Sequence, residues 1–378
     1  MPSPSDIYCM LRSHYHLSQS RPAVQYILRR SYWHVRYYLQ MGRTHLTELA
    51  GFVTSNVLPY GYSELGGFGR NPHGNCPCGG SSAGSAIAVA AGFCDAALGT
   101  ETRGSLMIPG FRNGVFSFKP TRGLISRSGI IPLSSSFDAP GVLARNPEIM
   151  KKVILTMVGV DLEDDQSFEL TKTESNPSRK RIICCVNRSL GEMELLQTEL
   201  RPFLAQLKLN GFEITFVDLP DVSFDYKTIS SADIRSDMAE FLQRFGSDNE
   251  PRSFEELVER YRERPNAHLY GMERLEDALA MPQIQKSDLK KLVQENVAKA
   301  RDLINSILDR YDGDFVGFLN FVDWFSIGGG PSCTLPVSFE TKPPISIMLG
   351  SRVGNDLALL NIVQEFSEIA KATQYTEN

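Results

Sequence analysis

The chain has 378 residues, 42% of them hydrophobic and 22% charged, and this composition excludes a disordered, collagen-like or disulfide-scaffold protein. Its formal net charge of −5 is unevenly distributed, because residues 1–118 contain nine arginines, five acidic residues and no lysine. Since these arginines are scattered rather than aligned with aromatic residues on one face, we expect no nucleic-acid partner.

The residue composition and periodicity change along the first part of the chain. Residues 1–40 are rich in aromatic residues but have weak periodicity, and no packed element is expected there. From Leu46 onward, Gly and Pro punctuate the chain as far as residues 85–92, a run of small residues typical of a buried helix. Short apolar pieces between glycines, at 114–118 and 124–126, predict strands.

Beyond about residue 146 the pattern alternates between strands and helices. The expected strands are 181–186, 212–217, 315–319, 332–339 and 345–349, and the expected helices are 192–210, a charged block at 232–312, and 355–370. In the charged block, Ser253 and Glu256 form a capping box, and a second helix is expected from Ser287 to about Tyr311. This order predicts an α/β fold with a helical insertion or cover over its sheet.

The cysteines and the apolar runs indicate which cellular compartment the protein occupies. Seven cysteines at irregular spacing favour reduced thiols over a disulfide framework. No apolar run reaches the ~18 residues of a membrane helix, and residues 1–12 lack the order of a signal peptide. We expect a cytoplasmic protein without a membrane span, and the sequence does not indicate its oligomeric state. Cys76-x-Cys78 and His14-x-His16 lack the further ligands of a zinc site, so no metal is expected.

Two Gly/Ser loops flank the predicted small-residue helix. They are residues 78–85 and 99–105, and loops of this kind bring hydroxyls and backbone N–H groups together at helix ends. On spacing alone, a pair of turns with serine caps is an equally good interpretation. Nucleotide binding is a weaker alternative, because the Gly-Lys-Ser/Thr ending of a P-loop and the Gly-x-Gly-x-x-Gly fingerprint are both absent.

These loops belong to a longer series of motifs in one order. The series is Gly42-Arg-Thr-His-Leu-Thr-Glu48, Arg70-Asn-Pro72, Pro77-Cys-Gly-Gly-Ser-Ser-Ala-Gly-Ser85, Leu98-Gly-Thr-Glu-Thr-Arg-Gly-Ser105, Phe118-Lys-Pro-Thr-Arg-Gly123, Gly129-Ile-Ile-Pro132, Ser136-Phe-Asp138 and Pro140-Gly-Val-Leu-Ala-Arg145. Read together, these motifs resemble the amidase signature family. Residues 329–337 and 349–352 resemble its C-terminal strands more loosely, and residues 150–315 match no motif.

The resemblance implies hydrolysis of a carboxylic amide through a Ser–cis-Ser–Lys triad, with no organic cofactor. It also implies an amidase signature fold, an α/β/α arrangement around a mixed sheet. Ser105 takes the place of the nucleophile, and Ser81, 24 positions earlier, that of the serine held by a cis peptide. Ser82 is expected to support these two serines. The backbone N–H groups that match the family's oxyanion hole are those of Thr102, Arg103, Gly104 and Ser105.

The chain departs from the family at the triad lysine. In the family this residue lies upstream of the cis-serine, a position that corresponds to residues 1–11 here, but the first lysine of the chain is Lys119. Ser5-Asp6 is the nearest match to the family's Lys-Asp pair. Arg12 is close, but a guanidinium does not accept a proton at neutral pH. Lys119 matches the family's Lys-Pro-Thr turn and is expected to be structural.

Further departures lie near the predicted nucleophile. Arg103 stands where many members have glycine. An Arg103 side chain that points inward would add a cation that could bind a substrate carboxylate. If it points outward, only the backbone N–H of Arg103 contributes to the site. We favour the outward interpretation. Met107 and Arg112 also differ and are expected to shape pockets. Asp138 and Arg145 are expected to form a buried polar anchor.

Three hypotheses account for these features. The first is an amidase-type hydrolase that acts through an acyl-enzyme and is impaired because a missing general base costs about 10²–10⁴ in rate. The second is a catalytically inactive relative that binds a small-molecule ligand or a protein partner. The third is an N-terminally truncated product of a gene for an active amidase.

The expected domain organisation follows the motifs. Residues 1–40 are expected to be a degenerate or truncated N-terminal segment, and 41–378 a single amidase-like domain. Within it we expect a signature core at 41–146, a variable helical insert at 147–315, and C-terminal strands and a helix at 316–378. The substrate is expected to be a small-molecule amide whose identity is set by the insert.

Overall fold

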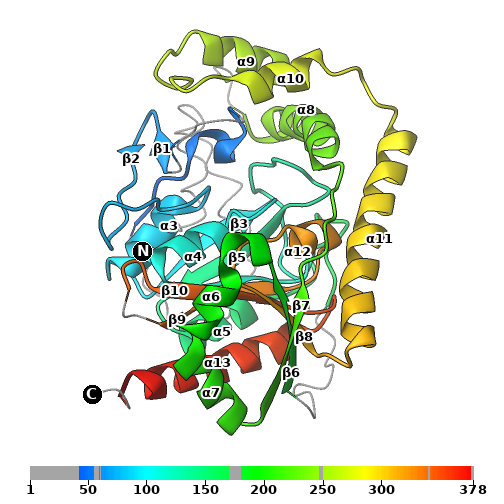
Figure 1. Cartoon of the computed structure of the whole chain (residues 1–378). Coiled ribbons are helices and arrows are strands. Elements are labelled where there is room, and N and C mark those ends of the chain that lie inside the picture. The colour runs from blue at the N-terminus through cyan, green and yellow to red at the C-terminus, as the bar shows by residue number, and fades with distance from the viewer. Residues whose placement is uncertain are drawn as a thin grey trace.

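A mixed eight-stranded sheet forms the centre of the fold (Figure 1). The computed structural model describes residues 42–54, 59, 61–169, 180–246, 250–338 and 341–375. Segment 1–40 lies outside these residues, and with it Ser5, Asp6, Arg12 and the His14-x-His16 pair.

The sheet combines antiparallel and parallel pairings. Its strand order is β3-β5-β4-β9-β10-β8-β6-β7, antiparallel from β3 to β8 and parallel from β8 through β6 to β7. The strands are β3 Ala96–Glu101, β4 Phe116–Lys119, β5 Ala139–Ala144, β6 Lys180–Val186, β7 Phe212–Asp218, β8 Phe315–Phe318, β9 Ser332–Ser338 and β10 Ile345–Gly350. A separate hairpin joins β1 Tyr62–Ser63 to β2 Gly67–Phe68. The mixed sheet of the expected α/β class is confirmed.

Helices cover both faces of this sheet. One core contains α5 Pro147–Met157, α6 Glu192–Gln197, α7 Arg201–Leu209 and α13 Asp356–Tyr375, and the opposite core contains α3 Ala83–Ala90, α4 Met107–Asn113, α11 Lys286–Arg310 and α12 Trp324–Gly328. Strand β6 shows why the sheet needs a layer of helices on each of its two faces. Ile182 and Cys184 face the first core while Ile183 and Cys185 face the second, because successive side chains of a strand alternate in direction.

A third core lies away from the sheet, at the top of Figure 1. It is formed by α8 Tyr226–Phe245, α9 Phe254–Arg262 and α10 Glu273–Ala280. These helices pack on a 3₁₀ turn, η1 Glu48–Gly51, and on residues 130–133. The charged block was expected to be an insertion or a cover over the sheet, and of its helices only α11 covers the sheet. The other three helices cover loops, because their apolar faces meet one another and these two segments.

Most of the predicted elements are present, and residues 85–92 correspond to the buried helix α3. The predicted strand at 124–126 is wrong. The Ser126 hydroxyl bonds the carboxylate of Asp161 at 2.7 Å, and the Arg127 N–H bonds that of Asp164 at 2.8 Å. These side-chain contacts replace the backbone ladder that a strand would need.

The single helix predicted at 192–210 is also wrong in part. The structure divides it into α6 and α7, which begins at Arg201 with Pro202 in its first turn. A proline has no N–H for the preceding turn and its ring clashes with that turn, so it is accommodated where a new helix begins. A 3₁₀ turn, η2 Arg188–Leu190, precedes α6.

The prediction that Asp138 and Arg145 form a buried polar anchor is correct only for Asp138. Asp138 is buried. The Arg145 side chain is 60% exposed and forms a surface ion pair with Asp95 at 2.6 Å, so the prediction for Arg145 is wrong. None of the described cysteines forms a disulfide, in agreement with the expected thiols. Among the described residues, no helix combines the length and apolar character needed to cross a membrane.

Gly141→Ala should destabilise the sheet. A Cβ at Gly141 would lie 2.3 Å from the backbone oxygen of Phe118 on the neighbouring strand, and backbone moves less easily than a side chain. We expect the free energy of unfolding to fall by about 1–3 kcal/mol, as for other overpacked interiors, with a lower Tm in thermal denaturation. Gly159→Ala is the control, because its Cβ would meet nothing within 4 Å. Equal Tm values for the two variants would contradict this prediction.

Candidate active site

Ser81 lies in a buried loop ahead of α3. The Gly80–Ser81 peptide bond is cis. The Ser81 carbonyl accepts a hydrogen bond from the Thr47 N–H at 3.0 Å, and the residue is only 3% exposed. Within the described part of the chain, the Ser81 hydroxyl has no hydrogen-bond partner.

Ser82 joins this loop to the segment that carries Ser105. Its N–H donates to the Ser105 carbonyl at 3.1 Å. Its hydroxyl donates to the Thr100 carbonyl at 3.2 Å and accepts from the Thr100 N–H at 3.3 Å. A Cβ at Gly99 would lie 2.6 Å from the Ser82 hydroxyl oxygen, so the contact requires glycine there. The two Gly/Ser loops therefore meet, and Ser105 is held beside the Ser81–Ser82 segment.

Glu101 fixes the chain on the other side of Ser105. Its carboxylate is fully buried and accepts from the N–H groups of Leu106 and Met107 at 2.9 and 3.0 Å. The Ser326 hydroxyl donates to its second oxygen at 2.7 Å. The carboxylate thus satisfies N–H groups where α4 begins, which the helix itself leaves unbonded. Sequence reasoning missed this residue, although Glu101 is the single acidic residue between Asp95 and Asp138.

The predicted oxyanion turn is also held by Asp138. The Thr102 hydroxyl donates to one carboxylate oxygen of Asp138, and the N–H groups of Leu133 and Ser134 donate to the other at 2.8 and 3.0 Å. Burial raises the pKa of Asp138 to about 6, although these donors and the positive charge of Arg127 oppose the rise. Thr102 is therefore fixed to the loop that precedes β5.

The Arg103 side chain points away from this turn. Its guanidinium pairs with Asp323 at 2.8 Å, is 47% exposed, and lies 4.9 Å from the centre of the Tyr226 ring. This agrees with the outward interpretation. Lys119, by contrast, is fully buried, and its amine donates to the carbonyl of Gly330 at 2.6 Å. Burial lowers the pKa of Lys119 to about 8, against the opposing effect of the negative charge on Glu101.

A small cavity lies beside Ser81. Its lining residues are Leu49, Ala50, Ser81, Thr100, Thr102, Ile131, Pro132, Leu133, Asp138, Ile234 and Met238. The space open to the centre of a water-sized sphere is about 10 Å³. The cavity therefore brings Ser81 and Thr102, two of the predicted site residues, to one space. Ser105 is not among its lining residues.

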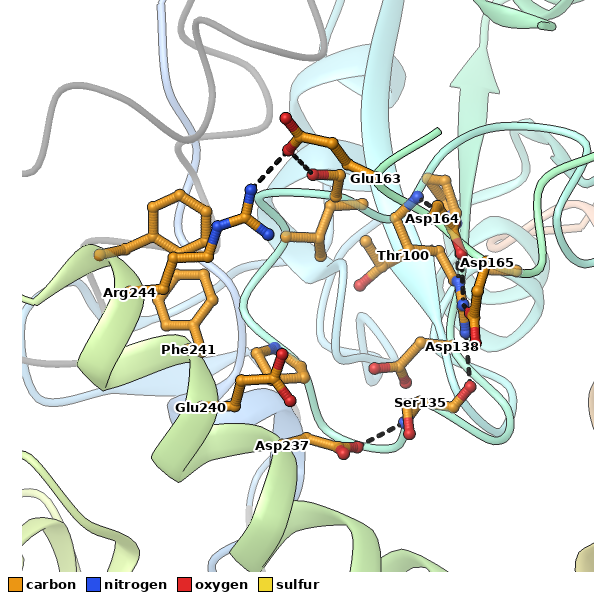
Figure 2. A pocket seen from close by; sticks show the side chains of 17 residues that line it. Thr100, Ser135, Asp138, Glu163, Asp164, Asp165, Asp237, Glu240, Phe241 and Arg244 are labelled. Carbon is orange, nitrogen blue, oxygen red and sulfur yellow. Dashed lines mark hydrogen bonds and ion pairs between the residues drawn. The ribbon is translucent and has the colours of Figure 1, made fainter. Parts of the chain in front are cut away.

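A larger pocket of about 380 Å³ lies next to it. Figure 2 shows its carboxylates, which come from Glu163 and its neighbours on one side and from α8, including Asp237, on the other. Arg244 reaches across to Glu163. The two spaces share Thr100, Pro132 and Asp138, but neither predicted catalytic serine lines the acidic pocket.

Glu48 anchors the segment that forms another wall of the small cavity. Its buried carboxylate accepts from the Tyr261 hydroxyl of α9 and from the Glu64 N–H at 2.8 Å. Burial raises the pKa of Glu48 to about 7, although both hydrogen bonds act to lower it. Leu49 and Ala50 follow directly, so this contact sets where the cavity wall lies. Sequence reasoning did not find Glu48 either, because its partner is more than 200 residues away.

Comparison with known proteins identifies the family of this chain. The sequence model of the family described as Amidase matches residues 38–316. The chain belongs to the amidase family. Two relatives are the glutamyl-tRNA(Gln) amidotransferase subunits A of Campylobacter lari, 34% identical over 53% of this chain and 45% of the relative, and of Halorhodospira halophila, 27% identical over 88% and 74%. The chain spans about half the length of the Campylobacter relatives.

Solved structures of amidases have the same fold. The peptide amidase of Stenotrophomonas maltophilia aligns with a TM-score of 0.78 at 24% identity, covering 87% of this chain and 73% of that one. The structure of PAM12A aligns with a TM-score of 0.84 at 24% identity, covering 95% and 79%. The predicted amidase fold is confirmed.

Glu48→Gln should change how the stability of this amidase depends on pH. The folded chain keeps the Glu48 proton between the ordinary pKa of 4.5 and about 7, a range in which the unfolded chain releases it. The free energy of unfolding therefore falls as the pH rises through this range, and the variant lacks the part due to Glu48. Urea unfolding midpoints at about pH 5 and about pH 7 measure the difference.

The control for this test is Glu199→Gln, because Glu199 is exposed. It should keep the wild-type pH dependence. Asp138 and Asp237 have raised pKa values too, so a residual dependence of the same sign is expected in Glu48→Gln. A dependence as steep in Glu48→Gln as in the wild type would refute the prediction.

Proposed function

We propose that this chain is an amide hydrolase in which Ser105 attacks the carbonyl carbon of a small-molecule amide and forms an acyl-enzyme. The observation that carries the proposal is the hydrogen bond from the Ser82 N–H to the Ser105 carbonyl, which joins the two Gly/Ser loops. The Ser81 hydroxyl, which has no hydrogen-bond partner among the residues that the structure describes, belongs to the residue before Ser82. Membership of the amidase family supports the same chemistry.

In the proposed reaction, the Ser105 hydroxyl proton passes to the Ser81 oxygen as the new C–O bond forms, and Ser81 passes its own hydroxyl proton on to the nitrogen that leaves. The carbonyl oxygen gains negative charge, which the N–H groups of residues 102–105 stabilise. The C–N bond then breaks, the nitrogen takes up a proton and leaves as the amine, and water hydrolyses the ester. Glu101 supports this step indirectly, since its carboxylate fixes the backbone that follows Ser105 and bonds Ser326 of α12.

The proposed reaction has no identified general base, and this limits the rate that we expect. The printed sequence contains no lysine before Lys119, and the amine of Lys119 is bonded to the Gly330 and Pro120 carbonyls. A general base contributes about 10²–10⁴ in rate, so we expect slow hydrolysis from a chain of this sequence. The lysine-free stretch also favours the second candidate function, a catalytically inactive relative that binds an amide ligand. For both functions we propose a cytoplasmic location and one domain over residues 41–378.

Ser105→Ala should abolish both amide hydrolysis and covalent labelling. A fluorophosphonate probe labels a serine that has a partner to take its proton and donors for the developing oxyanion, and we expect slow labelling of the wild type. The modified residue is identified by peptide mass spectrometry. Ser81→Ala should slow labelling by about 10²-fold or more, because the proton loses its acceptor.

The matched control is Ser332→Ala. Ser332 is fully buried on β9 and its hydroxyl has no partner in the described structure, so its loss should leave labelling unchanged. Labelling that persists in Ser105→Ala would disprove the assignment of the nucleophile. A wild type that is neither labelled nor active, but still binds amides, would establish the second candidate function instead.

A further inference from the structure

The cavity beside Ser81 has the size of one water molecule. The space open to the centre of a water-sized sphere is about 10 Å³, close to the smallest volume that holds a water. The polar residues in its lining are Ser81, Thr100, Thr102 and Asp138. A buried water needs about two to four polar partners, so this cavity has both the room and the groups for one.

Ser81 supplies the first partner. The residue is 3% exposed, and its hydroxyl has no hydrogen-bond partner among the residues that the structure describes. Buried polar groups are almost always hydrogen-bonded, so we expect this hydroxyl to bond the occupant of the cavity that Ser81 lines. The apolar part of the wall, which includes Ile131 and Met238, offers it no other partner.

Asp138 supplies the second partner. Within the described structure its carboxylate accepts three hydrogen bonds, from the Thr102 hydroxyl on one oxygen and from the N–H groups of Leu133 and Ser134 on the other. An ionised carboxylate has about four acceptor positions. The oxygen that bonds Thr102 therefore keeps one position for a water in the cavity.

The surroundings of Asp138 suit a proton acceptor. Burial raises its pKa to about 6, against the effect of its hydrogen bonds and of the positive charge on Arg127. A base with a pKa just below neutral is ionised at neutral pH and still takes up a proton, which is the range in which general bases work best. Charged or titratable groups lie around it on the loops, Arg122, Arg127 and Asp164, and on α8, Tyr226, Asp233 and Asp237.

We propose that a water in this cavity links the Ser81 hydroxyl to Asp138, and that Asp138 is the final proton acceptor of the proposed reaction. The inference rests on the function proposed above and supplies the general base that it lacks. No lysine precedes Lys119, whose amine is bonded to backbone carbonyls. A carboxylate then takes the role that the family resemblance assigns to a lysine.

The proton moves in three transfers. As the Ser105 oxygen bonds the carbonyl carbon, its proton passes to the Ser81 oxygen, the Ser81 proton passes to the water, and a water proton passes to Asp138. The water is thereby regenerated and Asp138 becomes neutral. When the C–N bond breaks, the transfers run in reverse, and Ser81 gives its proton to the leaving nitrogen. Asp138 is then ionised again, so no proton is gained or lost.

The first test is the pH dependence of fluorophosphonate labelling at Ser105. Because only ionised Asp138 accepts the proton, the wild-type labelling rate should rise about tenfold between about pH 5 and about pH 7. Asp138→Asn keeps the shape of the side chain, since its oxygen can accept the loop N–H groups and its amide can donate to the Thr102 hydroxyl. This variant should be labelled slower by about 10²-fold or more, and without the rise.

Asp237→Asn is the matched control. Burial raises the pKa of Asp237 to about 7, yet Asp237 does not line the cavity beside Ser81. The control should keep the rise. A rise that survives in Asp138→Asn, or that disappears only in Asp237→Asn, would overturn the proposal. A wild-type rate that stays constant over this range would overturn it as well, whether or not the variants fold.

A high-resolution crystal structure of the wild-type chain tests the water without catalysis. It should contain one water within hydrogen-bond distance of both the Ser81 hydroxyl and the Asp138 carboxylate. A cavity without a water, or a Ser81 hydroxyl bonded to a different group, would overturn the relay.

Failure of this inference can be told apart from failure of the proposed function. Labelling that is lost in Ser105→Ala but unaffected by Asp138→Asn would keep the hydrolase proposal and overturn this one. A wild type that is not labelled at any pH would overturn both, because the relay serves only a serine that loses its proton.

Discussion

The candidate site depends on the contact between Ser82 and the segment from Thr100 to Ser105. One residue supplies three hydrogen bonds there, from its N–H to the Ser105 carbonyl and between its hydroxyl and both polar backbone groups of Thr100. A hydroxyl can both donate and accept, so serine satisfies a carbonyl and an N–H that lie side by side. The small side chain and the missing Cβ at Gly99 allow the two backbones to approach this closely.

A buried negative charge next to the predicted oxyanion turn needs compensation. Glu101 lies at the end of β3, close to the N–H groups that would stabilise an oxyanion. Its charge is offset by the α4 N–H groups of Leu106 and Met107 and by the buried cation of Lys119, whose pKa it raises. A buried glutamate thus holds the backbone that follows Ser105, and a buried lysine amine offsets its charge.

Sequence patterns predict elements whose stability is local. The small residues of α3 and the apolar run of β6 reveal a buried helix and a buried strand, because the reason for burial lies within each segment. Residues 124–126 look like a strand but do not form one, because Ser126 and the following Arg127 bond Asp161 and Asp164, which are more than 30 residues away. The sequence motifs likewise identify Ser81 and Ser105 as candidate site residues.

The roles of Glu101 and Glu48 can be recognised only from hydrogen-bond partners that lie far away in the sequence. Glu101 is bonded to Ser326, and Glu48 is bonded to Tyr261, in each case across more than 200 residues. A lone glutamate has no local periodicity that distinguishes a buried hydrogen-bonded carboxylate from a surface one. The α8 wall of the small cavity is similar, because the helical block predicted at 232–312 includes most of α8 but does not predict that Ile234 and Met238 line the cavity beside Ser81.

The predicted site residues and one wall of the small cavity belong to different parts of the chain. The predicted serines and oxyanion turn lie within residues 79–107 and are held by bonds to the sheet and α12, whereas α8 supplies Ile234 and Met238 to the cavity wall. Hydrogen bonds connect α8 to the oxyanion turn through the 133–138 loop, from Asp233 and Asp237 to Ser134 and Ser135, and from Asp138 to Thr102. Apolar changes in α8 that keep these carboxylates can reshape the cavity while leaving the position of Ser105 intact.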